Sequence, residues 1–192
     1  MKIIIMENDI YSAEGLKFLS GRCGLITEEI EIVTSIHALK DSLSHTKFDR
    51  IITRIQGCDE NIGDWLGLLA DFPTYFAQEK VITWEPTGSK RLTLLSGKTF
   101  ITPKNIDKNG RIADILHQIS LFLMPGKIPS EANTPSAKLS MKEMKILSML
   151  CTGDTPKIIS ALTKMPIKTI SLHKTRAIKK FGVKNLTELL FY

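Results

Sequence analysis

The basic segment 167–180 is the part of the sequence whose residue types and spacing most clearly suggest chemistry. It reads Ile-Lys-Thr-Ile-Ser-Leu-His-Lys-Thr-Arg-Ala-Ile-Lys-Lys and contains no acidic residue. Lysine and arginine side chains can bind phosphates, whereas serine, threonine and leucine side chains can approach base edges in a major groove. The segment alone is equally consistent with a helix that binds DNA and with a solvated basic surface helix.

Helical periodicity separates this segment into two sides. The predicted inner, apolar stripe consists of Ile167, Ile170, Ala177, Ile178 and Phe181. The predicted outer side consists of Lys168, Ser171, Leu172, Thr175 and Lys179. Lys174 and Arg176 flank it. A helix with one side in a small core and the other facing a polyanion would show this division.

The positive charge of the chain is concentrated at its C-terminal end. Residues 138–192 contain 11 Lys and Arg against 3 Asp and Glu, a net charge of +8, whereas residues 1–137 carry −2. A compact basic module suggests a polyanionic partner. Charge by itself does not distinguish DNA from RNA or from an anionic surface.

The composition favours a soluble, cytoplasmic globular protein without a membrane partner. Hydrophobic residues make up 43% and charged residues 24% of the chain, and no apolar run approaches the roughly 20 residues of a membrane span. Cys23, Cys58 and Cys151 and the four histidines are too scattered for a metal site, so we expect neither metal nor cofactor. No set of catalytic residues stands out, and we expect no enzyme.

Apolar runs alternate with helical patterns over the first 124 residues. The five predicted pairs of strand and helix are residues 2–6 and 10–21, 30–33 and 36–45, 49–55 and 64–72, 81–84 and 89–95, and 100–101 and 111–124. This alternation predicts an α/β fold in which helices cover both faces of a parallel sheet. Functional groups in such folds gather at the carboxyl ends of the strands.

A proline-rich segment, residues 125–137, separates this part from a helical one and is predicted to be a linker. We therefore expect domains at residues 1–124 and 138–192. Ser140 and Glu143 form a capping-box pattern, Thr155-Pro156 begins a second helix, and Gly182 ends the basic helix. Residues 138–192 thus read as four short helices, the second and third joined by a turn as in a helix-turn-helix.

The last 55 residues resemble the LuxR/FixJ type of helix-turn-helix domain. The residues that carry the resemblance are Leu139-Ser140, Glu143, Ile146-Leu147, Gly153, Lys157, Ile159, Thr169, His173 and the Phe-Gly-Val-Lys-Asn of 181–185. The resemblance implies that residues 155–162 cross the DNA backbone and that 167–180 enter the major groove. The departures from the family pattern are Ser171, Thr163 and Pro166.

The resemblance also implies roles for individual residues. The DNA-binding positions would be Lys157, Lys168, Thr169, Ser171, Leu172, Lys174, Thr175, Arg176 and Lys179. Of these, Ser171, Leu172 and Thr175 would read bases, and the basic side chains would lie near phosphates. Members of the family pair through the final helix, so Leu189, Leu190 and Phe191 would be either dimer contacts or domain core.

Residues 1–124 resemble the receiver domain of a two-domain (NarL-type) response regulator. The resemblance rests on residues 6–9, on 14–16, on 48–52 and on the order of elements. It implies a flavodoxin-like fold with a five-stranded parallel sheet. Receivers bind Mg²⁺ with an acidic pair after the first strand, accept phosphate on an aspartate after the third, and use a Thr or Ser and a Lys on the fourth and fifth.

In this chain several of these positions carry other residues. The pocket would consist of Glu7, Asn8, Asp9, Arg54, Thr83 and Lys104, with Glu85 as the alternative to Thr83 and with Pro103 beside Lys104. The acceptor position falls on Arg54. Arginine cannot accept phosphate, and the cation of Arg54 would repel Mg²⁺ and could pair with Glu7 or Asp9. We therefore expect a degenerate receiver that an internal ion pair locks; the alternative is a shifted alignment with Asp49 or Asp59 as acceptor.

The function predicted from the sequence is that of a sequence-specific transcription regulator. It would bind double-stranded DNA as a homodimer, independently of phosphorylation, with RNA polymerase as a further candidate partner. The alternative is an auxiliary regulator that acts mainly as a heterodimer partner of a related response regulator.

Overall fold

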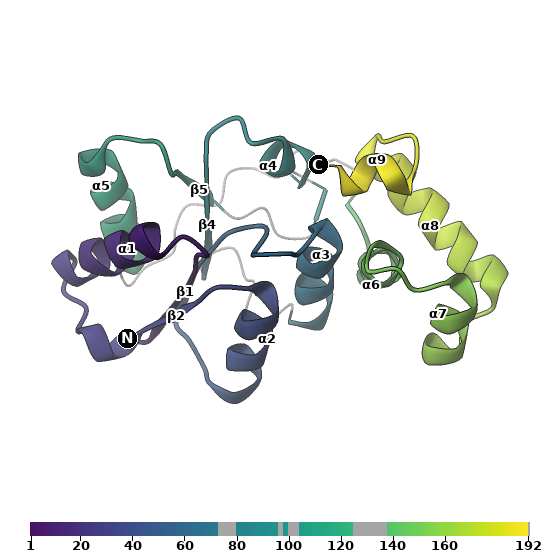
Figure 1. The fold of residues 1–192 in the computed structure, drawn as a ribbon, viewed down its shortest axis with the longest axis horizontal. Coiled ribbons are helices and arrows are strands. Elements are labelled where there is room, and N and C mark those ends of the chain that lie inside the picture. The colour runs from purple at the N-terminus through teal and green to yellow at the C-terminus, as the bar shows by residue number, and fades with distance from the viewer. Residues whose placement is uncertain (73–79, 96–97, 100–103, 125–137, 192) are drawn as a thin grey trace.

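The computed structural model describes residues 1–72, 80–95, 98–99, 104–124 and 138–191. A layered α/β part and a smaller, all-helical part lie side by side (Figure 1). This is the predicted fold class. The predicted linker, residues 125–137, lies outside the described residues. None of the described helices is both long and apolar enough to cross a bilayer.

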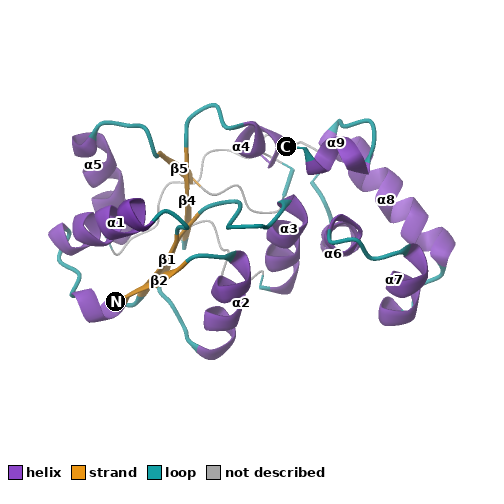
Figure 2. Ribbon diagram, viewed as in Figure 1, coloured by secondary structure: helices purple, strands orange, loops and turns teal. Residues whose placement is uncertain are grey.

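The α/β part is built on a parallel sheet of five strands (Figure 2). The strands are β1 (Ile3–Met6), β2 (Ile30–Val33), β3 (Arg50–Thr53), β4 (Val81–Glu85) and β5 (Lys104–Asp107). Their order in the sheet is β2-β1-β3-β4-β5, and every neighbouring pair is parallel. The predicted five-stranded, receiver-like sheet is therefore confirmed.

Helices cover both faces of this sheet (Figures 1 and 2). One face is covered by α1 (Ile10–Arg22) and α5 (Ile112–Leu123); the other by α2 (Ile36–His45), α3 (Ile62–Asp71) and α4 (Lys90–Leu95), with a 3-10 turn at Thr27–Glu29 before β2. Side chains alternate along β1: Ile3 and Ile5 belong to the apolar cluster that contains α1 and α5 residues, and Ile4 and Met6 to the cluster that contains α2 and α3 residues. A strand buried on both faces must be apolar throughout, which is why β1 shows no alternation.

The fifth strand differs from the prediction. The predicted strand, residues 100–101, lies outside the described residues, and β5 begins at Lys104. Only Ile106 of its four residues is fully buried, because β5 is an edge strand with a single neighbour. Asn105 fastens it to β4: its side-chain Oδ1 accepts from the Glu85 amide at 3.0 Å, and its Nδ2 donates to the Glu85 carbonyl at 2.9 Å.

The helical part contains α6 (Met141–Cys151), α7 (Pro156–Thr163), α8 (Ile167–Phe181) and α9 (Leu186–Leu190). The predicted capping box is present: Ser140 accepts from the Glu143 amide at 3.2 Å, and Glu143 from the Ser140 amide at 2.7 Å. Thr155 caps α7, and Gly182 ends α8 with a φ of 74°, a left-handed conformation that glycine adopts without strain. The turn between α7 and α8 completes the predicted helix-turn-helix.

A buried ion pair ties the first helix of this part to the third. The Glu143 carboxylate, 4% exposed, accepts from Lys180 Nζ at 2.6 Å. Burial disfavours its charge, but the hydrogen bonds from Lys180 and from the Ser140 amide outweigh burial and lower the pKa of Glu143. A carboxyl with a lowered pKa in the folded state stabilises the fold above its ordinary pKa of about 4.5, and this contribution is lost as the pH falls.

We therefore expect Glu143→Gln to lower the stability of the helical part at pH 7 by about 1.5–3 kcal/mol. The difference between the wild type and the variant should shrink as the pH falls below the ordinary pKa of a glutamate. Urea unfolding of both proteins between pH 7 and pH 3, followed by circular dichroism, measures this difference. A difference that is constant over this range would show that the ion pair does not contribute.

Candidate functional site

The outer side of α8 is accessible to a partner. Lys168, Ser171, Thr175, Arg176 and Lys179 are exposed, and so is the Leu172 side chain, which is 47% exposed. Lys157, on α7, is also exposed. Seven of the nine predicted DNA-binding residues therefore lie on the surface, and six of them lie on one helix.

The other two predicted DNA-binding residues, Thr169 and Lys174, are only half-exposed. They flank the buried stripe of α8, which consists of Ile170, Ala177 and Phe181. They therefore border the exposed side rather than lie at its centre.

The inner stripe was predicted partly wrongly. Ile167 is 46% exposed, because it is the first residue of α8 and lies beyond the apolar core that the helix covers. Ile178 is only partly buried and packs at the edge of that core.

Two features of α8 bear on what it can bind. Its basic and hydroxyl side chains share the exposed side with Leu172, so that phosphates and base edges could be contacted together. The Thr175 hydroxyl donates to the Ser171 carbonyl at 2.9 Å, which leaves the oxygen lone pairs and the methyl group of Thr175 for contacts.

The three predicted dimer residues do not share one environment. Leu189 is fully buried in the core cluster that includes Phe181 and Val183, so of the two alternatives, dimer contact and domain core, it is domain core. Helix packing requires one inward side chain even in so short a helix. Leu190 and Phe191 are 40% and 86% exposed and remain available to a partner.

A second cluster lies at the carboxyl ends of the strands in the α/β part. Glu7 follows β1, Arg54 follows β3, Glu85 ends β4 and Lys108 follows β5. Arg54 Nη1 is 3.3 Å from Glu7 Oε1, and Arg54 Nε is 3.1 Å from Glu85 Oε1. Lys108 Nζ is 3.0 Å from Glu7 Oε2. We call these four residues the charge quartet.

The carboxylates of the charge quartet are the buried members. Glu7 is 0% and Glu85 2% exposed, and the backbone amides of Asp9 and Ile55 donate to them at 3.0 and 2.9 Å. Burial disfavours the charge of Arg54, but the hydrogen bonds and charges of Glu85 and Glu7 outweigh it and raise the pKa of Arg54. Two buried carboxylates and two cations thus neutralise each other.

Asp9 and Asn8 lie at the rim of the charge quartet. The Asp9 carboxylate caps α1, and the hydrogen bond from Ser12 lowers its pKa. The cation beside Asp9 is Lys108, whose Nζ lies 3.9 Å from Asp9 Oδ2. Arg54 was expected to pair with Glu7 or Asp9, and it pairs with Glu7. Asn8 is exposed.

The structure corrects two predicted members of the pocket. Thr83 is buried, but its hydroxyl lies 3.0 Å from Asn105 Oδ1 and 3.2 Å from the Lys104 carbonyl, toward β5. Lys104 begins β5 and is exposed, at the end of the strand away from the charge quartet. Glu85, the alternative to Thr83, lies in the charge quartet in its place. Lys108 replaces Lys104, because the fifth strand ends at Asp107 and not near Pro103.

The alternative acceptors, Asp49 and Asp59, are not members of the charge quartet. Asp49 precedes β3, where it accepts from the Lys2 amide at 2.8 Å, so it lies at the amino end of the sheet. Asp59 lies in the loop between β3 and α3, with a φ of 56°. Lys108 was missed from the sequence because Ile106 is the only apolar residue of the strand that precedes it.

A charge quartet of this kind differs chemically from a metal-binding pocket. Mg²⁺ requires several oxygen ligands with room for water, whereas the carboxylate oxygens here already bind a guanidinium and an ammonium group. Among the described residues, no group of three or more His, Cys, Asp or Glu side chains is arranged to hold a metal ion.

Comparison with known proteins identifies the family of the C-terminal part. Residues 137–192 match the family described as bacterial regulatory proteins, luxR family. A comparison with curated proteins gives no match. Among solved structures, RcsB from Salmonella enterica serovar Typhimurium, bound to promoter rprA in the presence of the phosphomimetic BeF3−, is 21% identical with a TM-score of 0.50, and the match covers 100% of this chain and 97% of that one.

A second solved structure, of two RcsB dimers bound to two parallel DNAs, is 23% identical with a TM-score of 0.55. The match covers 100% of this chain and 98% of that one. Similarities at this level of identity show a shared fold over both parts of the chain.

Proposed function

We propose that this chain, whose C-terminal part is a helix-turn-helix of the luxR family of bacterial regulatory proteins, is a sequence-specific DNA-binding regulator of transcription. Residues 138–192 would be the DNA-binding domain, 125–137 the linker and 1–124 a receiver-like domain. The observation that carries the proposal is the exposed outer side of α8, on which Lys168, Arg176 and Lys179 share the surface with Ser171 and Thr175.

The geometry supports major-groove binding by α8. A helix fits the major groove, where basic side chains at its margins can bind phosphates on either side. The exposed Lys157 on α7 would bind the backbone next to the groove. The RcsB structures, with promoter DNA in one case and as dimers on DNA in the other, support the same arrangement for this chain.

A selection of DNA duplexes tests the proposal directly. The purified full-length chain is incubated with a pool of random-sequence duplexes, and bound molecules are amplified and sequenced over several rounds. We expect enrichment of a motif with two half-sites about one helical turn apart, as a dimer requires. Failure to enrich any motif, together with DNA binding only after a related regulator is added, would favour the heterodimer alternative.

We further propose that this regulator is not switched by phosphorylation. Arg54 follows β3, at the position where the resemblance to receiver domains would place the acceptor aspartate, and its guanidinium binds both Glu7 and Glu85. Neither a phosphate acceptor nor a free metal-binding carboxylate pair remains there. Control would then come from protein abundance, a partner or a ligand.

We expect no phospho-aspartate after incubation of the chain with acetyl phosphate and Mg²⁺. Intact-mass spectrometry measures the addition of one phosphoryl group, and a receiver domain with an aspartate acceptor is the positive control. Phosphorylation of Asp59 or Asp49 would instead show that the acceptor has moved and would refute the independence from phosphorylation.

Dimerisation belongs to the proposal as well. Leu190 and Phe191 are exposed apolar side chains at the end of α9, and a second copy would remove them from water. DNA as the partner implies action in the cytoplasm.

A further inference from the structure

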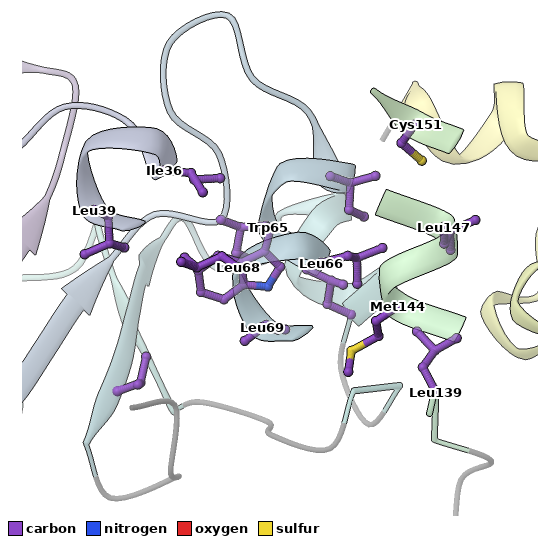
Figure 3. Close-up of a cluster of buried hydrophobic side chains, with 14 of the residues drawn as sticks. Ile36, Leu39, Trp65, Leu66, Leu68, Leu69, Leu139, Met144, Leu147 and Cys151 are labelled. Atoms are coloured by element: carbon purple, nitrogen blue, oxygen red, sulfur yellow. The ribbon is translucent and has the colours of Figure 1, made fainter. Parts of the chain in front are cut away.

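Helix α3 is buried on two sides, only one of which faces the sheet. Trp65, Leu68 and Leu69 face the sheet and are at most 2% exposed. Four further residues, at helical spacing, form a second side: Gly63, Leu66, Gly67 and Ala70. Leu66 is 0% exposed, and Figure 3 shows it between α3 and α6, opposite the sheet side on which Trp65 lies. We call these four residues, of which all but Leu66 are small, the small-residue side of α3.

The two glycines on this side allow α3 and α6 to approach each other closely. A Cβ atom added at Gly63 would lie 2.4 Å from the Cβ of Cys151, and one added at Gly67 would lie 2.6 Å from Ser148 Oγ. Carbon atoms in contact are normally about 3.5–4 Å apart. A side chain at Gly63 would therefore push the two helices apart, whereas one at Gly67 would first displace the Ser148 hydroxyl group, because the Ser148 Cβ lies at 3.5 Å.

Apolar and polar contacts complete the interface. Met144 and Leu147 of α6 belong to the same apolar cluster as Trp65 and Leu66, so that one core continues from the α/β part into the helical part (Figure 3). Asn61, the N-cap of α3, donates from Nδ2 to the Cys151 carbonyl at 3.3 Å.

At the other end of α3, Asp71 lies 3.7 Å from Lys145 Nζ of α6 and also pairs with Lys40 of α2. Desolvation, together with the charge of Asp64, raises the pKa of Cys151 to about 12, so its thiol stays neutral in the interface. The interface is thus apolar where Leu66, Met144 and Leu147 are buried and polar at both ends.

The side of α8 proposed to read DNA remains exposed while this interface is closed. Helix α6 lies between α3 and α8 (Figure 1), and α8 packs against α6 and α7. Lys168, Thr175 and Lys179 remain exposed in this arrangement. Binding of a duplex to α8 would therefore not require α6 to leave α3.

From these observations we infer that the small-residue side of α3 is a permanent docking site for α6, and that the chain binds DNA with its two parts joined. The second half of this inference rests on the proposed function. It means that the receiver-like domain acts as a rigid carrier of the helix-turn-helix, and that no domain release precedes DNA binding.

A disulfide that locks the interface tests the inference. Cysteines introduced as Gly67→Cys and Ser148→Cys would have Cβ atoms about 3.5 Å apart, which is within the range of disulfides. We expect this crosslink to form rapidly and completely on mild oxidation of the full-length chain. The two variants that carry only one of these substitutions, each beside the native Cys23, Cys58 and Cys151, are the controls for unrelated disulfides.

DNA binding of the locked protein is measured by fluorescence anisotropy with a labelled random-sequence duplex at low ionic strength. We expect the oxidised double variant to bind with a Kd within about threefold of its reduced form. A crosslink that fails to form, or a locked protein whose affinity falls more than about tenfold, overturns the inference. If neither redox form nor the wild type binds the duplex, the proposed function fails, and the crosslink yield alone decides whether α6 stays docked.

Alanine substitutions give a second test, because the inference predicts whether each one raises or lowers the thermal midpoint. Gly15 lies within α1 and has open space around it, so Gly15→Ala should raise the thermal midpoint, as alanine favours helix over glycine. Gly63→Ala should instead lower the midpoint, because its methyl group would lie 2.4 Å from the Cβ of Cys151 and 3.1 Å from the Ser148 carbonyl oxygen. A rise for Gly63→Ala similar to that for Gly15→Ala would show that α3 and α6 are not held together in solution.

Discussion

Replacing Arg54 with methionine should destabilise the chain by about 3–5 kcal/mol, the usual cost of removing one partner from a buried ion pair. Methionine fills a similar space but leaves Glu85 without a cation and Glu7 with Lys108 alone. Both carboxylates are buried, so water cannot replace the guanidinium. Urea unfolding at pH 7, followed by tryptophan fluorescence, measures the loss.

Two further variants identify the cause of this loss. Arg54→Lys keeps the charge but cannot bind two carboxylates with a planar fork, so we expect a smaller loss than with methionine. Glu85→Gln combined with Arg54→Met removes the uncompensated charge and should restore part of the stability. If Arg54→Met were as stable as the wild type, the charge quartet would have no structural role, and the account of a locked receiver would lose its physical basis.

The second large effect concerns DNA. Lys168→Ala combined with Lys179→Ala should weaken binding to every duplex and reduce the slope of log K against log salt by about 0.9 for each lost phosphate contact, or about 1.8 in total. Both lysines are exposed on the outer side of α8, and each would release counterions from the DNA on binding. Anisotropy titrations between 50 and 200 mM salt, roughly the range in which such slopes are measured, give this slope.

Matched controls separate this effect from a general loss of charge. Lys47→Ala removes one positive charge from an exposed position of the α/β part and should leave the slope unchanged, whereas each single substitution on α8 should reduce it by about 0.9. Ser171→Ala should alter the preferred sequence with little change in the slope, because serine carries no charge. An equal change of slope for Lys47→Ala and for the double variant would mean that α8 is not the DNA-binding element.

The elements that rest on local patterns were predictable. The apolar run of β1, the capping box of Ser140 and Glu143, and Gly182 at the end of α8 each encode their structure within a few residues. Their physics is local: hydrogen bonds to nearby amides, the freedom of glycine and the period of a helix or strand. The exposed outer side of α8 followed from the same period.

The misassigned residues depend on contacts between distant segments. Lys104 was chosen over Lys108 because β5, an edge strand with one fully buried apolar residue, has almost no apolar signal of its own. Its pairing with β4, in which Glu85 lies opposite Asp107, sets which lysine reaches Glu7. Leu189 was ambiguous because the sequence of a short apolar helix does not tell whether its own chain or a second copy covers it.

By itself, the sequence determined the parallel α/β architecture, the helix-turn-helix and the basic outer side of α8, because periodicity, caps and charge act over short distances. Only the tertiary structure decided that Arg54 binds Glu7 and Glu85 together, that Lys108 joins them, and that Gly63 and Gly67 receive α6. The physical reason is that strand register and helix–helix approach depend on segments up to a hundred residues apart, whose side chains meet only in the folded chain.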